Sequence, residues 1–256
     1  MLKNKWLIVV KKGFNDWSPE NITLFWDWLS SNSYLKDSYF SKQVGSGIFH
    51  LVKKQKKLEG DFLDYGCGSG FLIEYFLKTD LNCYGCDTSE ISVNMVNEKF
   101  KSIDRWKGAI KIEIFPIPFE KDKFDMIACI ETFEHLTDEM LINLLKEFYR
   151  VLKPGGIIIL TTPNKEDLDK GMIYCPFCNS EFHRMQHFQS FSSESLRNLF
   201  EQYHFKITYC KEINLQYYCK IDNLYLFFYK CYYLFNKNFF RRNSIEPHLC
   251  IIATKV

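Results

Sequence analysis

The chain has 256 residues, of which 46% are hydrophobic and 25% charged, and its formal net charge is +2. The length suits one α/β domain with additions, and the composition is ordinary for a soluble globular protein. The near-neutral charge gives no electrostatic case for binding nucleic acid or an acidic membrane. Ten cysteines without a secretory signal ahead of them predict reduced, core-filling thiols in a cytoplasmic protein.

The N-terminal part is expected to be helical over residues 18–57. Ser18 is a good cap residue, and Pro19 suits the first turn of a helix. The segment is rich in aromatic residues, which favours packing against the rest of the protein. We therefore divide the chain into a helical cap, residues 1–57, and a core, residues 58–256.

Strands and helices alternate through this core. The expected strands are 62–65, 82–86, 110–115, 124–130, 157–162, 205–210 and 249–254, and the expected helices are 70–78, 89–100, 137–152 and 193–203. This alternation implies an α/β fold with a mostly parallel sheet covered by helices on both faces. Two insertions interrupt it: residues 165–191, which carry paired cysteines and histidines, and residues 214–246, which are dense in Tyr and Phe.

The first expected strand runs into a glycine-rich turn, DFLDYGCGSG over residues 61–70. Asp64 is followed by Gly66, Gly68 and Gly70 at every second position. Glycine tolerates positive φ and lets a ligand approach the backbone closely. Dinucleotide and phosphate loops read G-x-G-x-x-G or G-x-x-x-x-G-K-[ST], and neither spacing occurs here. The turn therefore favours a nucleoside with a polar tail over a row of phosphates.

Three further segments follow in register. Residues 82–88 read NCYGCDT and end near Asp87, residues 124–135 read FDMIACIETFEH, and residues 149–164 read YRVLKPGGIIILTTPN. Together with the glycine turn, they resemble the class I S-adenosylmethionine-dependent methyltransferases, in the small-molecule branch that includes the ubiquinone-pathway O-methyltransferases. The resemblance covers residues 58–164 well and 190–256 loosely. It implies a Rossmann-like, seven-stranded, mostly parallel sheet whose last strand is antiparallel, an S-adenosylmethionine cofactor and an N-terminal segment folded over cofactor and substrate.

The resemblance also implies a cofactor site. Asp64, or a water that it orders, would hold the ammonium group of the cofactor, and Asp87 would accept both ribose hydroxyls. The alternative for both carboxylates is helix capping or turn formation. The complete set of expected cofactor residues is Asp64, Gly66, Cys67, Gly68, Gly70, Asp87, Thr88, Glu113, Ile114, Ile130 and Glu131.

His135 is the candidate catalytic residue, because it follows the fourth strand at the edge where an acceptor should approach. Methyl transfer mainly needs alignment, but an oxygen or nitrogen nucleophile can also need a general base. The alternative is a hydrogen bond at the entry to the next helix.

Residues 174–188 read YCPFCNSEFHRMQHF and hold a second constellation. Cys175, Cys178, His183 and His187 supply two thiolates and two imidazoles, which fill a tetrahedral zinc shell. The C-x₂-C-x₄-H spacing is close to that of a zinc knuckle, and H-x₃-H places both rings on one helical face. We predict a structural zinc clip, with two alternatives: a metal-free turn whose His183 or His187 lines the substrate pocket, and a redox pair.

The aromatic run within 214–246 is interrupted by charges and is too short for a confident membrane span. It is interpreted as a lid over the substrate, with a homodimer surface and an interfacial membrane helix as alternatives. The function expected is O-methylation of a small molecule or of a sugar- or nucleotide-linked intermediate. The alternatives are an RNA or protein methyltransferase that docks through the zinc element, and a cofactor-binding module without catalysis.

Overall fold

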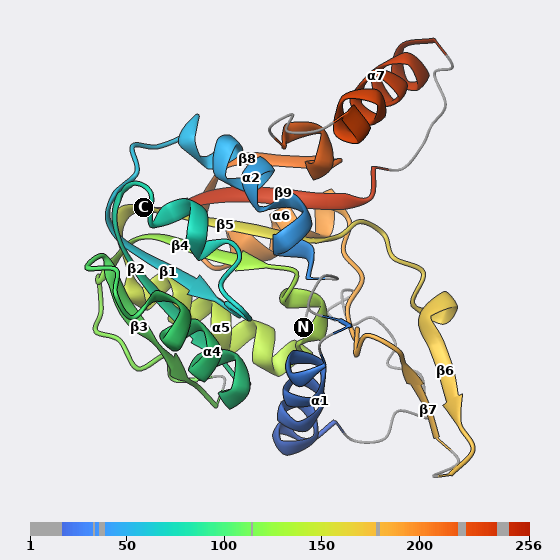
Figure 1. The fold of residues 1–256 in the computed structure, drawn as a ribbon, viewed down its shortest axis with the longest axis horizontal. Helices are drawn as coiled ribbons and strands as arrows, with labels where there is room; N and C mark the ends of the chain where they lie inside the picture. Colours follow the sequence, from blue (N-terminus) through green and yellow to red (C-terminus); the bar gives the residue numbers. More distant parts are fainter. Residues whose placement is uncertain are drawn as a thin grey trace, which may run out of the picture.

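The structure is a computed structural model and describes residues 17–32, 34–35, 39–113, 115–177, 180–219, 224–239 and 246–256. A seven-stranded sheet with the order β3-β2-β1-β4-β5-β9-β8 forms its centre (Figure 1). The strands of this sheet are β1 (Glu59–Tyr65), β2 (Asp80–Asp87), β3 (Trp106–Lys111), β4 (Phe124–Ile130), β5 (Leu152–Pro163), β8 (Phe205–Ile213) and β9 (His248–Lys255). The α-helices are α1 (Pro19–Ser31), α2 (Phe40–Lys53), α3 (Ile73–Phe76), α4 (Glu90–Phe100), α5 (Asp138–Val151), α6 (Ser193–Gln202) and α7 (Leu224–Phe239).

The strand directions confirm the expected fold class. β1 pairs in parallel with β2 and β4, while β9 pairs antiparallel with both β5 and β8. All parallel strands therefore end at the same edge of the sheet. The chain order changes direction beside β1, and in open α/β sheets a ligand binds in the crevice at such a point.

Both faces of the sheet are buried, and successive residues of one strand serve different faces. Phe62 of β1 packs in the cluster under α2 and α3, whereas Leu63 packs in the cluster under α5. The side of α5 that faces the sheet carries Leu144 and Phe148, spaced one helical turn apart, and both are fully buried. Two apolar layers therefore hold the sheet rigidly, which fixes the positions of the loops at its edge.

Several elements differ from the sequence expectation. The segment 18–57 forms two helices, α1 and α2, although Ser18 does cap α1 by accepting a bond from Asn21 N. β3 starts at Trp106 and ends at Lys111, four residues earlier than expected; beyond it Pro116 has no N–H with which to extend a ladder. Pro154, Gly155 and Gly156 are residue types that favour a turn. In the structure they form an irregularity inside β5, where the pairing skips from Leu152 to Ile157.

The two insertions leave the main sheet. Residues 172–183 form a hairpin of β6 (Met172–Cys175) and β7 (Ser180–His183), which projects beyond the sheet in Figure 1. α7 lies at the upper right of the view, above the hairpin, and contacts η4 (Leu215–Tyr218). Among the described residues, no helix is both long and apolar enough to cross a membrane. The expectation of core thiols is met at Cys67, Cys83, Cys86 and Cys129, which are all buried and unpaired.

Candidate active site

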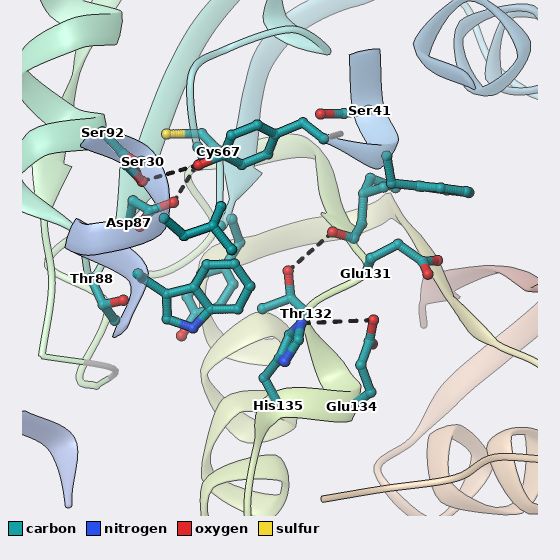
Figure 2. Close-up of a pocket in the computed structure, with 18 of the residues that line it drawn as sticks. Ser30, Ser41, Cys67, Asp87, Thr88, Ser92, Glu131, Thr132, Glu134 and His135 are labelled. Atoms are coloured by element: carbon teal, nitrogen blue, oxygen red, sulfur yellow. Dashed lines mark hydrogen bonds and ion pairs between the residues drawn. The ribbon is translucent and has the colours of Figure 1, made fainter. Parts of the chain in front are cut away.

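A cavity of about 280 Å³ lies at the carboxyl ends of β1, β2 and β4. Figure 2 shows two polar groups of side chains around it. Asp87 and Thr88 lie on one side with Ser30 and Ser92, and Glu131, Thr132, Glu134 and His135 lie on the other. A concave site with apolar walls and a few converging polar groups is the usual form of a small-molecule site.

The glycine turn needs glycine for two different reasons. Gly66 and Gly68 line the cavity with φ of 75° and 49°, and a Cβ on Gly66 would lie 2.7 Å from Thr132 Oγ1. Gly70 also has positive φ, but it faces α4, where a Cβ would lie 2.5 Å from Val96 Cγ2. The structure therefore places Gly66, Cys67 and Gly68 on the cavity wall and gives Gly70 a packing role.

Asp87 ties the glycine turn to β2 and also lines the cavity. One oxygen accepts a hydrogen bond from Gly68 N at 2.8 Å, and the other accepts one from Ser89 N at 2.9 Å. Burial raises the pKa of this carboxyl despite these hydrogen bonds. The structure thus combines the two interpretations of Asp87, because the carboxylate that forms the turn is also available to a ligand.

Asp64 is not on the cavity wall. It lies behind the turn with only 3% of its surface exposed. Burial, followed by the charge of Asp87, raises the pKa of Asp64 well above its ordinary value. An interaction with a ligand at this position needs a bridging group, such as the water proposed from the sequence.

The adenine end of the expected site differs from the sequence expectation. Glu113 is exposed and does not line the cavity, and Ile114 lies outside the described residues. Ile112 lines the cavity instead, and its N–H donates to the Asp87 carbonyl at 3.0 Å. Its apolar side chain suits a flat base better than the carboxylate of Glu113 does.

The opposite wall begins where β4 ends. Ile130 and Glu131 both line the cavity, and Glu131 has a φ of 49°, which is uncommon for a residue with a side chain. His248 Nδ1 lies 3.4 Å from one Glu131 oxygen, while the other oxygen is buried and has no hydrogen-bond partner among the described residues. Such a carboxylate, held in an uncommon backbone conformation, is a strong candidate to meet a ligand.

His135 lines the cavity and is 7% exposed. Its Nδ1 lies 3.3 Å from the Gln186 carbonyl, and its Nε2 lies 3.9 Å from Glu134 Oε1. Burial, followed by the charge of His187, lowers the pKa of His135 to about 3. The ring is therefore neutral at pH 7 and a weak proton acceptor, which counts against a role as a strong general base.

Several cavity residues come from the N-terminal segment. Trp26 of α1 meets the His135 ring edge-on at 4.8 Å, and its Nε1 donates to Gln186 Oε1 at 2.9 Å. Ser30 Oγ lies within hydrogen-bond distance of both Tyr39 Oη and Ser92 Oγ. In the sequence, only the aromatic residues of the N-terminal segment indicated a role in this wall. They gave no indication that Ser30 and Ser92 would line the cavity.

Of the predicted zinc ligands, the structure separates Cys175 from His183. Cys175 pairs with Ser180 near the tip of the hairpin, and His183 pairs with Met172 at its base. Three residues along a strand span roughly 10 Å and turn the side chains to opposite faces. Cys178 lies outside the described residues, so the four-ligand clip stays a prediction.

The two histidines of the insertion do meet, although no helix connects them. Their rings stack at 4.7 Å, and Glu166 lies beside both, 2.6 Å from His187 Nδ1 and 3.6 Å from His183 Nε2. Only His187 also lines the cavity, as one metal-free alternative expected. Sequence reasoning missed Glu166 as the partner of these rings, because their proximity depends on the fold.

A family model described as a methyltransferase domain matches residues 39–209. The chain belongs to this family. It is 30% identical over 168 residues to an uncharacterized protein of Methanocaldococcus jannaschii, an alignment that covers 66% of this chain and 67% of the relative. It is 26% identical to a ubiquinone biosynthesis O-methyltransferase of Colwellia psychrerythraea, over 51% of this chain and 53% of that one. The chain thus spans about half to two thirds of the length of these relatives.

Solved methyltransferase structures share the fold. A S-adenosylmethionine-dependent methyltransferase of Aquifex aeolicus superposes with a TM-score of 0.55 at 20% identity, over 93% of this chain and 99% of that one. A putative methyltransferase in complex with the Trm112 activator of Haloferax volcanii gives a TM-score of 0.62 at 15% identity, over 90% and 96%. At these identities the likeness shows the fold alone.

Proposed function

We propose that this family member is an S-adenosylmethionine-dependent methyltransferase that methylates an oxygen of a small molecule or of a sugar- or nucleotide-linked intermediate. The observation that carries the proposal is the Asp87–Gly68 contact at 2.8 Å, which fixes a carboxylate and a glycine turn on one cavity wall. Further support comes from the methyltransferase family model and from relatives that include O-methyltransferases.

The residues present fit an adenosyl group with a polar tail. Asp87 offers a buried carboxylate to the ribose hydroxyls, and Ile112 offers an apolar wall to the base. Glu131 offers to the ammonium group of the tail an oxygen that no described residue hydrogen-bonds. When bound, S-adenosylmethionine supplies a methyl group that is already activated on a sulfonium. The protein then has to orient the acceptor oxygen and exclude water.

The acceptor would lie beyond Glu131, beside His135 and Trp26. We assign His135 an orienting contact with this acceptor, because its lowered pKa makes it a poor base and its ring faces the cavity. Loss of turnover in His135→Ala with cofactor binding retained supports this assignment. Near-normal turnover contradicts it.

The test of the cofactor assignment is calorimetric titration of the purified protein with S-adenosylmethionine and with S-adenosylhomocysteine. Asp87→Ala should weaken binding at least tenfold, about 1.4 kcal/mol in binding free energy. Asp80→Ala is the matched control, because Asp80 begins the same strand with an exposed side chain and an ion pair to Arg105. Equal affinity of the Asp87 variant and the wild type would remove Asp87 from the site, and no uptake by the wild type would end the proposal.

Two other functions remain as outcomes of the same experiments. A non-catalytic module would bind S-adenosylmethionine tightly and consume it slowly with every acceptor tried. An RNA methyltransferase would bind RNA with a strong salt dependence, which a net charge of +2 does not favour.

A further inference from the structure

Two groups of histidine and acidic side chains share His187. In one, Glu134, His135 and His187 each offer a ligand atom, and these atoms lie within 4.8 Å of one another. In the other, Glu166, His183 and His187 do the same. All three residues of the first group line the cavity, whereas Glu166 and His183 of the second do not. The hydrogen bonds to the rings decide which group can hold an ion.

Both rings of the first group present a lone pair. His135 Nδ1 faces the Gln186 carbonyl, which only accepts, so this nitrogen carries the proton. His187 Nδ1 faces the Glu166 carboxylate at 2.6 Å, so it too carries the proton. With the proton on Nδ1, the lone pair of each imidazole is on Nε2. Among the described residues, His187 Nε2 has no hydrogen-bond partner.

These outer contacts are the ones that metal-bound histidines use. A ligating imidazole usually donates its other N–H to a carboxylate or a backbone carbonyl, which fixes its tautomer and its orientation. Glu166 and Gln186 supply one partner of each kind. The segment that carries His187 is also fastened to Glu134, whose carbonyl accepts from Phe188 N at 2.7 Å.

The second group lacks a free lone pair. His183 Nδ1 accepts the backbone N–H of His187 at 3.1 Å and that of Met185 at 3.3 Å, so the ring proton is on Nε2. That Nε2–H lies 3.6 Å from Glu166 and against Gly171, where even a Cβ would come within 1.7 Å of it. His183 therefore lies beside Glu166 and cannot coordinate a cation in this tautomer.

We propose that Glu134, His135 and His187 form a binding site for a divalent first-row transition-metal ion, open to the cavity. Two imidazole nitrogens and one carboxylate oxygen leave coordination positions for water or substrate, the arrangement of facial-triad sites. Bonds of about 2.1 Å allow at most roughly 4.2 Å between two ligand atoms, so a pair at the 4.8 Å limit would have to close by at least roughly 0.6 Å. Side-chain rotation supplies such a movement.

A bound cation would also balance the negative charge of the acidic side chains in this wall. Glu134 is 1% exposed and lies near Glu131 and Glu166. Among the described residues, His135 is the only basic side chain within ion-pair distance of Glu134. If the proposed function holds, the open positions of the ion face the acceptor and select a molecule with an oxygen donor beside the atom that is methylated.

The test measures metal binding without S-adenosylmethionine, so it does not depend on the proposed function. Chelator-treated protein is titrated with Co²⁺ and followed by visible absorption, and with Zn²⁺ and followed by calorimetry. We expect one ion per chain and a loss of affinity of at least tenfold in Glu134→Gln and in His135→Ala. Glu166→Gln removes an outer partner and should weaken binding 10- to 100-fold. His50→Ala, on α2 and outside the cavity, should leave it unchanged.

The Cys175→Ser/Cys178→Ser double variant separates this site from the zinc clip predicted from the sequence. We expect it to bind Co²⁺ as the wild type does, and we expect no near-ultraviolet thiolate-to-cobalt band in either protein. Loss of the ion only in the cysteine variant would overturn the proposal, as would absence of uptake by the wild type or unchanged affinity in both Glu134→Gln and His135→Ala. As a control for folding, S-adenosylhomocysteine binding is measured for each variant, and retained binding shows that the cavity is still formed.

Discussion

Asp64 and Asp87 show how one turn gives two carboxylates different environments. Asp87 accepts two backbone hydrogen bonds and meets the cavity, whereas Asp64 lies behind the turn and is 3% exposed. From the sequence we assigned both carboxylates to the cofactor site, because an acidic residue at the end of a strand gives the same pattern whether or not its side chain faces a ligand. Which carboxylate faces a ligand depends on the direction of the side chain, and only the folded strand sets that.

The raised pKa of Asp64 predicts a pH dependence of stability. A carboxyl with a higher pKa in the folded state binds more protons when folded, so stability falls as the pH rises from the ordinary value of 3.8 toward the raised pKa. Asp64→Asn removes this penalty. Chemical denaturation at pH 5 and pH 8 should show the variant gaining stability over the wild type as the pH rises. An identical difference at both values would mean that Asp64 is not protonated on folding.

For Gly70 and Glu113, too, the sequence does not show which way the residue faces. Both follow the pattern of cofactor residues, yet Gly70 faces α4 and Glu113 is exposed. A glycine can be required because a ligand approaches the backbone or because a helix packs against it. Both kinds of glycine look identical in the sequence, so the sequence does not distinguish them. His187 lines the cavity, which is where one alternative from the sequence placed it. Its partner Glu166 lies 21 residues away in the chain, so this contact could be found only in the fold.

At the scale of elements, the packing of α4 against the glycine turn predicts a large cost for Gly70→Ala. Its φ of 74° costs an alanine about 1–2 kcal/mol, and the contact with Val96 at 2.5 Å adds overpacking of about 1–3 kcal/mol. Gly155→Ala is a matched control, with φ of 73° and no atom within 4 Å of the added Cβ. Chemical denaturation should therefore show a greater loss for Gly70→Ala, and equal losses would mean that the turn adjusts to the added methyl group.

Elements with strong periodicity were predictable from the sequence, and interrupted ones were not. Strand β4 matches the expected 124–130, and α5 lies within one residue of its expected ends, because unbroken apolar patterns define them. The hairpin β6–β7 was missed, since its residues alternate weakly and its cysteines suggested a metal clip. The Pro-Gly-Gly segment reads as a turn, but the neighbouring strand keeps it within β5 as a bulge.

At the scale of the whole molecule, two segments are candidates for covering the cavity: the aromatic segment that contains α7, and helix α1. The aromatic segment that contains α7 was interpreted as a lid, yet none of its described residues lines the cavity, and Phe228 and Tyr232 are more than half exposed. α1 is fastened over the cavity instead. Asp27 accepts a hydrogen bond from Ser89 Oγ at 2.6 Å, and Trp26 and Ser30 add contacts to the opposite wall and to α4.

Hydrogen exchange can distinguish these two covers. Ligand contacts on α1 would suppress its local opening, because each opening would then also break the contacts to the ligand. Saturation with S-adenosylhomocysteine should therefore slow amide exchange in residues 19–31 and 66–70 and leave residues 224–239 nearly unchanged. Asp27→Ala removes the link to Ser89 and should reduce the protection of α1 more than that of the glycine turn. Slower exchange confined to α7 would instead restore the aromatic lid and leave α1 as ordinary packing.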